Sequence, residues 1–355
     1  MNLDDLTVFQ RLDAHHYYPH IESLPEKLQS GWELGQSLPL PDVLQAAGFH
    51  QILLVAMGSG AGDAAGLLAA YAAPVCPVPV SLHQDYDLPA WVRGPQALVV
   101  AISFSGNTEE TLSAYAQARE RGCTCLALTT GGRLAELAAG QAVWRFEHRG
   151  PARAAISLIF SMLLALFFRL DLLPDPQAEL AETLQVLQEQ QKNWQAEVPA
   201  VRNPAKRMAG QLVGRAITVF GSGVLAPVAL RWKAQLNLLA KAWAQAEKLP
   251  AVSYTSLAGS QSPEQALSRM IAIFLRAAVN HPRNLLRSDL MRQQFMLDGV
   301  NTDYFNAAGQ SRLAQQWSTL LMGEYAAFYL AMAYGVDPTP IEAREQMQAA
   351  LDAAR

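Results

Sequence analysis

The chain has 355 residues, of which 51% are hydrophobic and 16% are charged, and this balance favours a packed fold over a disordered chain. Its length leaves room for two domains of common size. The formal net charge is −4 and no run of lysines or arginines occurs, which argues against a nucleic-acid-binding protein.

The cysteines, the N-terminus and one long apolar stretch bear on the class of protein. The three cysteines form no metal-binding spacing and no even disulfide set, so a reduced, cytoplasmic protein is expected. Residues 1–5 are acidic and lack the apolar core of a secretory signal. Residues 154–170 are apolar but are interrupted by Arg169, which predicts a buried core helix and not a membrane span.

In chain order, the first half repeats a strand, a loop and a helix. Strands are predicted at residues 51–56, 77–82, 97–102, 124–129 and 143–146. Helices are predicted at residues 64–72, 109–121 and 133–139. This order is typical of an α/β fold with a doubly wound parallel sheet, which binds ligands at the carboxyl ends of its strands.

The second half begins after the Pro-Asp-Pro sequence at residues 174–176. Its predicted elements are a polar helix at 179–196, a strand at 216–220, a helix from 224 to about 247, weaker strands at 284–286 and 294–297, a helix at 313–334 and a short terminal helix. We therefore expect an N-terminal domain at 1–175, a connecting helix and linker at 176–205, and a C-terminal domain at 206–355.

A serine-rich turn follows the third predicted strand. Ser103, Ser105 and Thr108 place three hydroxyls at the start of a helix, and Gly106 permits close approach of the backbone. Hydroxyls and unpaired helix N–H groups together favour a phosphate site without lysine or metal. An ordinary capped helix remains the alternative, because Ser105 and Thr108 are also good capping residues.

A glycine-rich turn follows the first predicted strand and contains Gly58, Ser59 and Gly60. Its spacing does not match the G-x-G-x-x-G fingerprint of dinucleotide-binding proteins. Neighbouring parallel strands end at the same edge of a sheet. We therefore interpret this turn as the second wall of one pocket, opposite the serine-rich turn.

Several motifs resemble a known family. The sequences MGSG at 57–60, SFSGNTEET at 103–111 and TTGGRL at 129–134 are similar to those of the sugar isomerase (SIS) domain. The sequences RAA at 153–155, ALRWKAQLN at 229–237 and GVDPTP at 335–340, with Lys241 and Leu249-Pro250, resemble the bifunctional phosphoglucose/phosphomannose isomerases. The resemblance covers nearly the whole chain.

This resemblance implies two SIS domains, a homodimer, and an aldose–ketose isomerase without metal or organic cofactor. The implied substrates are the 6-phosphates of glucose, mannose and fructose. The implied phosphate-binding residues are Ser103, Ser105, Gly106, Asn107 and Thr108, with Gly58, Ser59 and Gly60 beside them.

Two further residues have implied roles near the reacting end of the sugar. Arg153 is implied to stabilise the negative charge of the enediolate, a role suited to a fixed guanidinium. Thr339 is implied to contact the sugar. The structural alternatives are that Arg153 pairs with a nearby carboxylate and that the Thr339 hydroxyl completes a proline turn.

The chain departs from the family at the catalytic positions. Leu238 stands where the family has the glutamate that moves the proton between C1 and C2, and Tyr254 stands where the family has a histidine that helps to open the ring. Tyr254 is a candidate proton donor, although a tyrosine is a weak base near neutral pH. Gln346 and Gln348 lie in a region where relatives have a lysine.

Two functions from different classes therefore stay open. One is a working isomerase with a relocated base, for which Glu264 or Glu324 would have to fold into the site, since Glu247 would lie on the opposite face of the predicted helix. The other is a sugar-phosphate binder without catalysis. His15, His16 and His20 lack accompanying metal ligands, so they are expected on a surface or interface.

Overall fold

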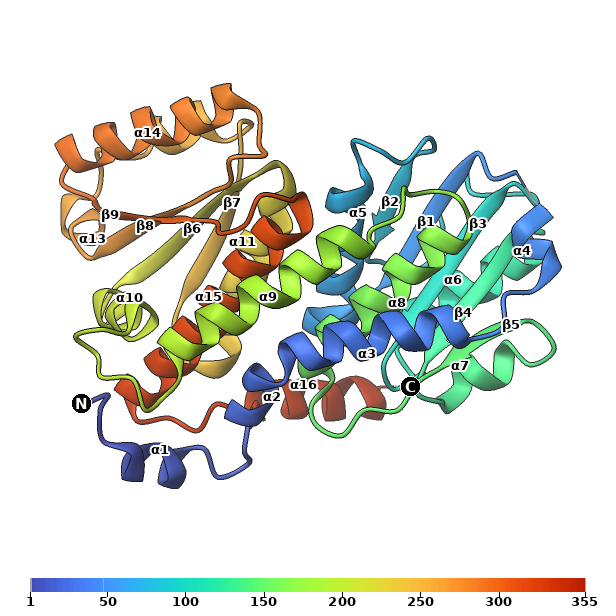
Figure 1. The fold of residues 1–355 in the computed structure, drawn as a ribbon, viewed down its shortest axis with the longest axis horizontal. Helices are drawn as coiled ribbons and strands as arrows, with labels where there is room; N and C mark the ends of the chain where they lie inside the picture. The colour runs from blue at the N-terminus through green and yellow to red at the C-terminus, as the bar shows by residue number, and fades with distance from the viewer. Residues whose placement is uncertain (1, 47, 355) are drawn as a thin grey trace.

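Two parallel sheets lie side by side in the computed structural model, which describes residues 2–46 and 48–354 (Figure 1). The first sheet has the order β2-β1-β3-β4-β5 and the second has the order β7-β6-β8-β9. All strand pairs are parallel. The predicted α/β class with two doubly wound parallel sheets is confirmed.

The strands of the first sheet match the predicted positions closely. They are β1 (Gln51–Ala56), β2 (Val80–His83), β3 (Ala97–Ser103), β4 (Thr124–Thr129) and β5 (Ala142–Arg145). Strand β3 is buried at every residue because helices cover both faces of the sheet. Consecutive residues of β3 accordingly belong to different apolar clusters, with Leu98 and Val100 on one face and Val99 on the other.

Helices surround both sheets. In the first half they are α1 (Leu6–Leu12), α2 (Tyr18–Glu22), α3 (Leu24–Ser37), α4 (Asp42–Ala46), α5 (Asp63–Ala72), α6 (Glu109–Glu120), α7 (Gly132–Leu137) and α8 (Ile156–Arg169). In the second half they are α9 (Gln177–Trp194), α10 (Pro204–Leu212), α11 (Ala226–Leu239), α12 (Ser253–Ala258), α13 (Glu264–Leu267), α14 (Pro282–Leu297), α15 (Arg312–Tyr334) and α16 (Glu342–Ala353).

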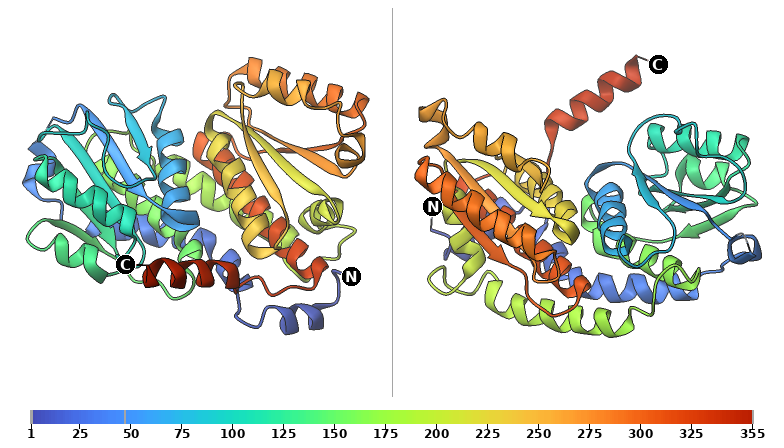
Figure 2. Two further views of the ribbon diagram at one scale, coloured as in Figure 1. Left: turned by 180° about the vertical axis from the view of Figure 1, so that it is seen from behind. Right: turned by 90° about the horizontal axis from the view of Figure 1, so that it is seen from above.

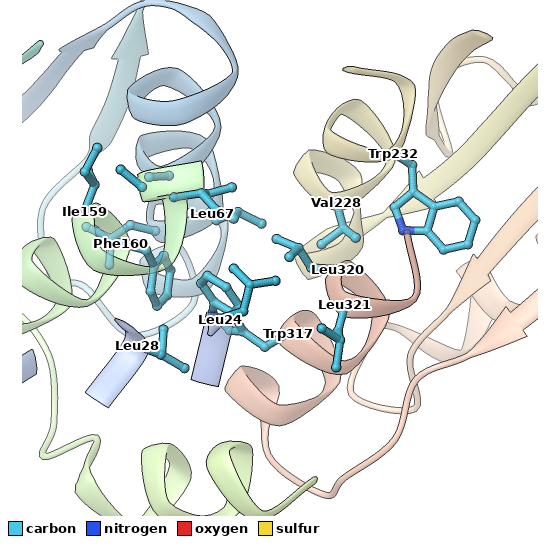
Figure 3. Packing of buried hydrophobic residues seen from close by; sticks show 14 of the residues in the cluster. Leu24, Leu28, Leu67, Ile159, Phe160, Val228, Trp232, Trp317, Leu320 and Leu321 are labelled. Carbon is cyan, nitrogen blue, oxygen red and sulfur yellow. The ribbon is translucent and has the colours of Figure 1, made fainter. Parts of the chain in front are cut away.

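The two halves share one apolar core. Figure 3 shows side chains of α3, α5 and α8 facing those of α11 and α15, and Phe160 packs edge-on against Trp317 with 5.0 Å between ring centroids. A single cluster of buried residues continues from the first sheet to the second. Burial of this shared surface, at about 25 cal/mol per Å² of apolar area, opposes separation of the halves.

The apolar stretch around α8 behaves as a core helix. Within the described chain, the segment 152–169 is the one helix long and apolar enough to cross a membrane, and 83% of it is buried inside the protein. The helix packs against α3 and α5. This burial agrees with the predicted core helix.

The second sheet was predicted less well. Its strands are β6 (Ala216–Ser222), β7 (Ala244–Leu249), β8 (Met270–Arg276) and β9 (Asn301–Asn306), of which only β6 was predicted. The prediction of one helix from 224 to about 247 is wrong, because α11 ends at Leu239 and Lys241 adopts the left-handed conformation at φ +53°. Asn237 then bonds both the N–H and the C=O of Ala244 and turns the chain into β7.

The weaker strand predictions at 284–286 and 294–297 are also wrong, since both segments lie in α14. Pro282 occupies the first turn of this helix and His281 caps it by accepting the N–H of Arg283 at 3.1 Å. The buried residues Ser288, Met291 and Phe295 recur at helical spacing. This periodicity was present in the sequence and was missed.

Candidate functional site

A cleft of about 540 Å³ lies where the two halves meet, at the carboxyl ends of β1 and β3. The chain order of the first sheet reverses between these two strands, which is where parallel sheets of this kind bind ligands. The lining comes from the glycine-rich turn at 57–61, the serine-rich turn at 103–108, residues 151–153, helix α11, and two residues near the C-terminus, Ile341 and Arg344. Segments far apart in the sequence thus form one site.

The serine-rich turn has a fixed shape. The Ser103 hydroxyl lies 2.9 Å from the Thr108 hydroxyl and accepts the Gly106 N–H at 3.1 Å. The Ser105 hydroxyl accepts the Asn107 N–H at 3.2 Å. Gly106 has φ +68°, and a Cβ there would lie 1.8 Å from a carbonyl oxygen of the neighbouring turn, so only glycine fits.

The helix that follows this turn has no side-chain cap. Thr108 occupies the N-cap position of α6 and makes no side-chain bond to the first helix N–H groups. Ser103, Ser105 and Thr108 line the cleft. Asn107 instead accepts the Arg133 N–H at 3.1 Å and so joins the turn to its neighbour. The geometry therefore presents hydroxyls, in front of a helix start, to the cleft.

The glycine-rich turn forms the opposite wall as a π-helical turn at Gly58–Gly62. Gly58 has φ +73°, and a Cβ on Gly60 would lie 2.3 Å from the Ala152 carbonyl oxygen. This close approach packs the turn directly against the segment that carries Arg153. Gly58, Ser59 and Gly60 all line the cleft.

Arg153 is held by carbonyl oxygens and not by a carboxylate. Its Nη2 donates to the carbonyl oxygens of Pro338 at 3.1 Å and Thr339 at 2.9 Å, and its guanidinium lies 4.9 Å from the centre of the Tyr17 ring. The side chain is 7% exposed, and its Nε has no hydrogen-bond partner within the described residues. No ion pair of Arg153 occurs among them either, so its positive charge is not neutralised by a carboxylate.

Thr339 lies beside Arg153 in a second hollow of about 500 Å³ that continues the cleft. The turn is shaped by Asp337, whose carboxylate accepts the Thr339 N–H at 2.8 Å. The Thr339 hydroxyl is buried and has no partner in the described part of the chain. The hydroxyl is therefore not what completes the proline turn.

A buried arginine in α11 connects the walls of the cleft. Arg231 donates to Glu324 at 2.6 Å and to Asp63 at 3.2 Å, and also to the carbonyl oxygens of Ser59 and, at 3.0 Å, Arg153. Burial raises the pKa of Asp63, and the Arg231 guanidinium opposes this shift. The sequence motif at 229–237 contains Arg231, but the motif alone gave this residue no role.

Leu238 and Tyr254, the residues expected at the catalytic positions of the family, lie in different surroundings. Leu238 is half-buried and lines the cleft beside Asn237. Tyr254 is 76% exposed on α12, where the Arg287 guanidinium lies 5.8 Å from its ring centre, and it does not line the cleft. Lys241 donates to the Leu238 carbonyl oxygen at 2.6 Å, and burial, with the nearby Arg153, lowers the pKa of Lys241.

Neither hollow is lined by Glu247, Glu264 or Glu324, the three carboxylates discussed above as alternative bases. Glu324 is buried and paired with Arg231, Glu264 is exposed on α13, and Glu247 lies on β7. The expectation that Glu247 lies on the opposite face of a helix is wrong, because this residue is in strand β7; it nevertheless does not line the cleft.

The N-terminal histidines gather no metal ligands. No group of three or more potential metal ligands occurs in the described residues. His15 pairs with Asp337 at 2.9 Å, whereas His20 lies beside Lys27 and His148. Burial, followed by Lys27 and His20, lowers the pKa of His148 to about 4.

Comparison with known proteins identifies the family. Residues 201–351 match the family model of the bacterial phospho-glucose isomerase C-terminal SIS domain. A bifunctional phosphoglucose/phosphomannose isomerase of Caldicellulosiruptor bescii is 33% identical, with 92% of this chain and 96% of the relative covered. One of the same name from Aquifex aeolicus is 28% identical, covering 76% of this chain and 80% of the relative.

A solved structure shows the same fold. A glucose-6-phosphate isomerase-like protein of Thermus thermophilus superposes with a TM-score of 0.64 at 19% identity, covering 96% of this chain and 98% of that one. The level of identity to the Caldicellulosiruptor protein and the almost complete coverage of both chains show the relationship. The chain belongs to the bifunctional phosphoglucose/phosphomannose isomerase family, whose members are phosphosugar isomerases.

Proposed function

We propose that the cleft binds a hexose 6-phosphate and interconverts glucose 6-phosphate or mannose 6-phosphate with fructose 6-phosphate. The observation that carries this proposal is the meeting of the uncapped serine-rich turn with Arg153 in one cleft. The first suits the phosphate group and the second suits the reacting end of the sugar. The names of the relatives give the substrates in question.

The phosphate-binding half of the proposal rests on Ser103, Ser105 and Thr108. A phosphate at this turn receives hydroxyl donors and the N–H groups of a helix start that no N-cap side chain covers, and the helix dipole favours its negative charge. Hydrogen bonds to a charged acceptor contribute about 1.5–3 kcal/mol each. The glycine-rich turn closes the other side of the anion.

The catalytic half rests on Arg153 and Thr339. Isomerisation removes the proton at C2 of the open aldose, and negative charge then develops on the carbonyl oxygen at C1. A buried guanidinium with an unpartnered Nε, and a hydroxyl without a partner in the described chain, are groups that stabilise such an oxyanion. The Arg153 guanidinium is fixed before the reaction, because its Nη2 donates to two carbonyl oxygens.

A second function, sugar-phosphate binding without turnover, has its own support. Leu238 puts hydrocarbon into the cleft at the position of the family glutamate, and Tyr254 is exposed outside it. Loss of a positioned acid or base typically lowers the rate about 10²- to 10⁴-fold. A protein with this cleft and no base would act as a sensor or as a partner of a metabolic enzyme.

One experiment separates the two functions. The purified protein is incubated with fructose 6-phosphate in D₂O, and deuterium at C1 and C2 is followed by NMR, while titration calorimetry measures binding. Exchange above the protein-free rate supports the isomerase. Binding without exchange supports the binder, and absence of binding contradicts both.

The same proposal includes a cytoplasmic homodimer. The free thiols of Cys76, Cys123 and Cys125 support a reducing compartment. Trp243, 72% exposed just before the edge strand β7, and Leu230, 54% exposed on α11, support self-association of this half. Sedimentation velocity over a range of concentrations measures the oligomeric state directly.

A further inference from the structure

The cleft does not end at Arg153. Arg153, Ile341 and Arg344 line both the main cleft and the second hollow, so the two are continuous. The far wall of the second hollow is α16, which projects from the body of the molecule as a separate helix (Figure 2). A ligand held at the serine-rich turn would therefore extend toward this terminal helix.

One face of α16 is turned toward Arg153. Glu345, Gln348 and Ala349 line the hollow, and their spacing of three and four residues places them on one side of the helix. Glu345 is the one carboxylate among the described residues that line either hollow. Thr339 and Arg153 line this hollow as well, so the one carboxylate shares it with the two residues proposed to stabilise the oxyanion.

We propose that Glu345 is the base that moves the proton between C1 and C2, in place of the carboxylate absent at position 238; this inference rests on the proposed function. No ion pair of Glu345 occurs in the described chain, so its carboxylate is not neutralised by a cation. Glu324, by contrast, is already committed to Arg231. A carboxylate opposite fixed donors is the arrangement that enolisation requires.

The proposed reaction is balanced without a co-reactant. The Glu345 carboxylate takes the proton from C2 of the open aldose, the C–H electron pair forms the C1=C2 double bond, and the C=O electron pair moves to O1, facing Arg153. The proton on O2 passes to O1 through solvent. The O2 electron pair then forms the C2=O bond, while the C1=C2 pair takes the proton back from Glu345 at C1. The product is the ketose, and the carboxylate is restored.

Arg344 makes the hollow more suitable for an anionic substrate. It lines both parts of the cleft, so a second arginine borders the same volume as Arg153. The positive charges of Arg153 and Arg344 attract the phosphosugar. Glu345 is next to Arg344 on the same helix, α16.

Glu345→Gln tests the assignment, with Glu342→Gln as the matched control. Glu342 is on the same helix, is exposed, and lines neither hollow. Deuterium exchange into fructose 6-phosphate in D₂O and calorimetric binding of the same compound are measured for the parent and both variants. We expect Glu345→Gln to lower exchange about 10²-fold or more with unchanged affinity, and Glu342→Gln to match the parent.

The outcomes are distinguishable. Exchange at the parental rate in Glu345→Gln overturns the assignment of this base and leaves the isomerase function standing. Binding by the parent without any exchange overturns both the base and the isomerase. A parent that does not bind fructose 6-phosphate overturns the proposed function itself and the inference with it.

Discussion

The substitution Glu324→Gln removes one negative charge from the buried cluster of Arg231, Glu324 and Asp63, which joins the two halves of the chain. Glu324 and Arg231 are 2.6 Å apart, with side chains 2% and 1% exposed. Glutamine has nearly the same shape as glutamate, so the substitution keeps the volume of the side chain. It replaces one acceptor oxygen by an NH2 group, which then faces a donor, either the Arg231 Nε or the Gln235 Nε2. Arg231 still pairs with Asp63 at 3.2 Å in this variant, so its positive charge keeps one carboxylate partner.

The expected cost follows from this remaining partner. Breaking a buried ion pair costs about 3–5 kcal/mol when the other charge loses its compensation. Since Asp63 stays in place, we expect Glu324→Gln to lower the free energy of unfolding by about 2–3 kcal/mol. The control is Asp289→Asn, which breaks a pair with Arg276 whose side chains are 42% and 25% exposed. That change should cost under about 1 kcal/mol.

Urea unfolding followed by fluorescence and circular dichroism compares the two variants with the parent. Glu324→Gln should also weaken phosphosugar binding, because Arg231 holds the carbonyl oxygens of Ser59 and Arg153 in the walls of the cleft. Asp289→Asn should leave binding unchanged. If Glu324→Gln unfolds at the same urea concentration as Asp289→Asn, the cluster does not stabilise the contact between the halves.

The remaining predictions concern the turn, the cleft and pH. Ser105→Ala combined with Thr108→Val should weaken calorimetric binding of fructose 6-phosphate by about 1–3 kcal/mol, and unchanged affinity would remove the phosphate assignment. Leu238→Glu, made in the Glu345→Gln variant, should raise deuterium exchange by about 10²-fold or more, because position 238 lines the same cleft. If exchange stays as low as in Glu345→Gln, a carboxylate at position 238 does not reach the sugar. The folded-state pKa of His148, about 4 against an ordinary 6.5, means that its contribution to stability is present above pH 6.5 and is lost as the pH falls toward 4. His148→Phe should flatten this part of a plot of urea midpoint against pH, and an unaltered plot would exclude the histidine as its source.

The first sheet was predictable because its burial is visible in the sequence. Strands such as β3 are continuous apolar runs between turns rich in glycine and serine, as strands covered on both faces must be. The second sheet gave a weaker signal. The edge strand β7 has exposed and half-buried residues between two buried ends, and β9 contains no fully buried residue, so neither reads as an apolar run. Strand β8 has such a run and was overlooked.

The candidate site was predictable only where it is local. Ser103, Ser105 and Thr108 lie within six positions. A strand-to-helix turn brings them together by local geometry, independently of the tertiary structure. Arg231 and Glu324 are 93 positions apart, and only the packing of α11 against α15 joins them. The position of Glu345 beside the second hollow could not be predicted in this way, because it depends on the path of the chain after α15.

The shared core and the Arg231 cluster explain how the chain forms its cleft with a leucine at position 238, where a glutamate is expected from the family resemblance. The walls are positioned by backbone atoms, the carbonyl oxygens of Ser59 and Arg153, and these contacts do not involve the side chain at 238. Leucine there is half-buried, so it gains from burial where a carboxylate would lose hydration. A leucine at position 238 therefore leaves the contacts that position the walls undisturbed. The proposed isomerisation then requires a carboxylate from another segment. Helix α16 can supply Glu345, because Arg153 holds the turn that precedes this helix through the carbonyl oxygens of Pro338 and Thr339.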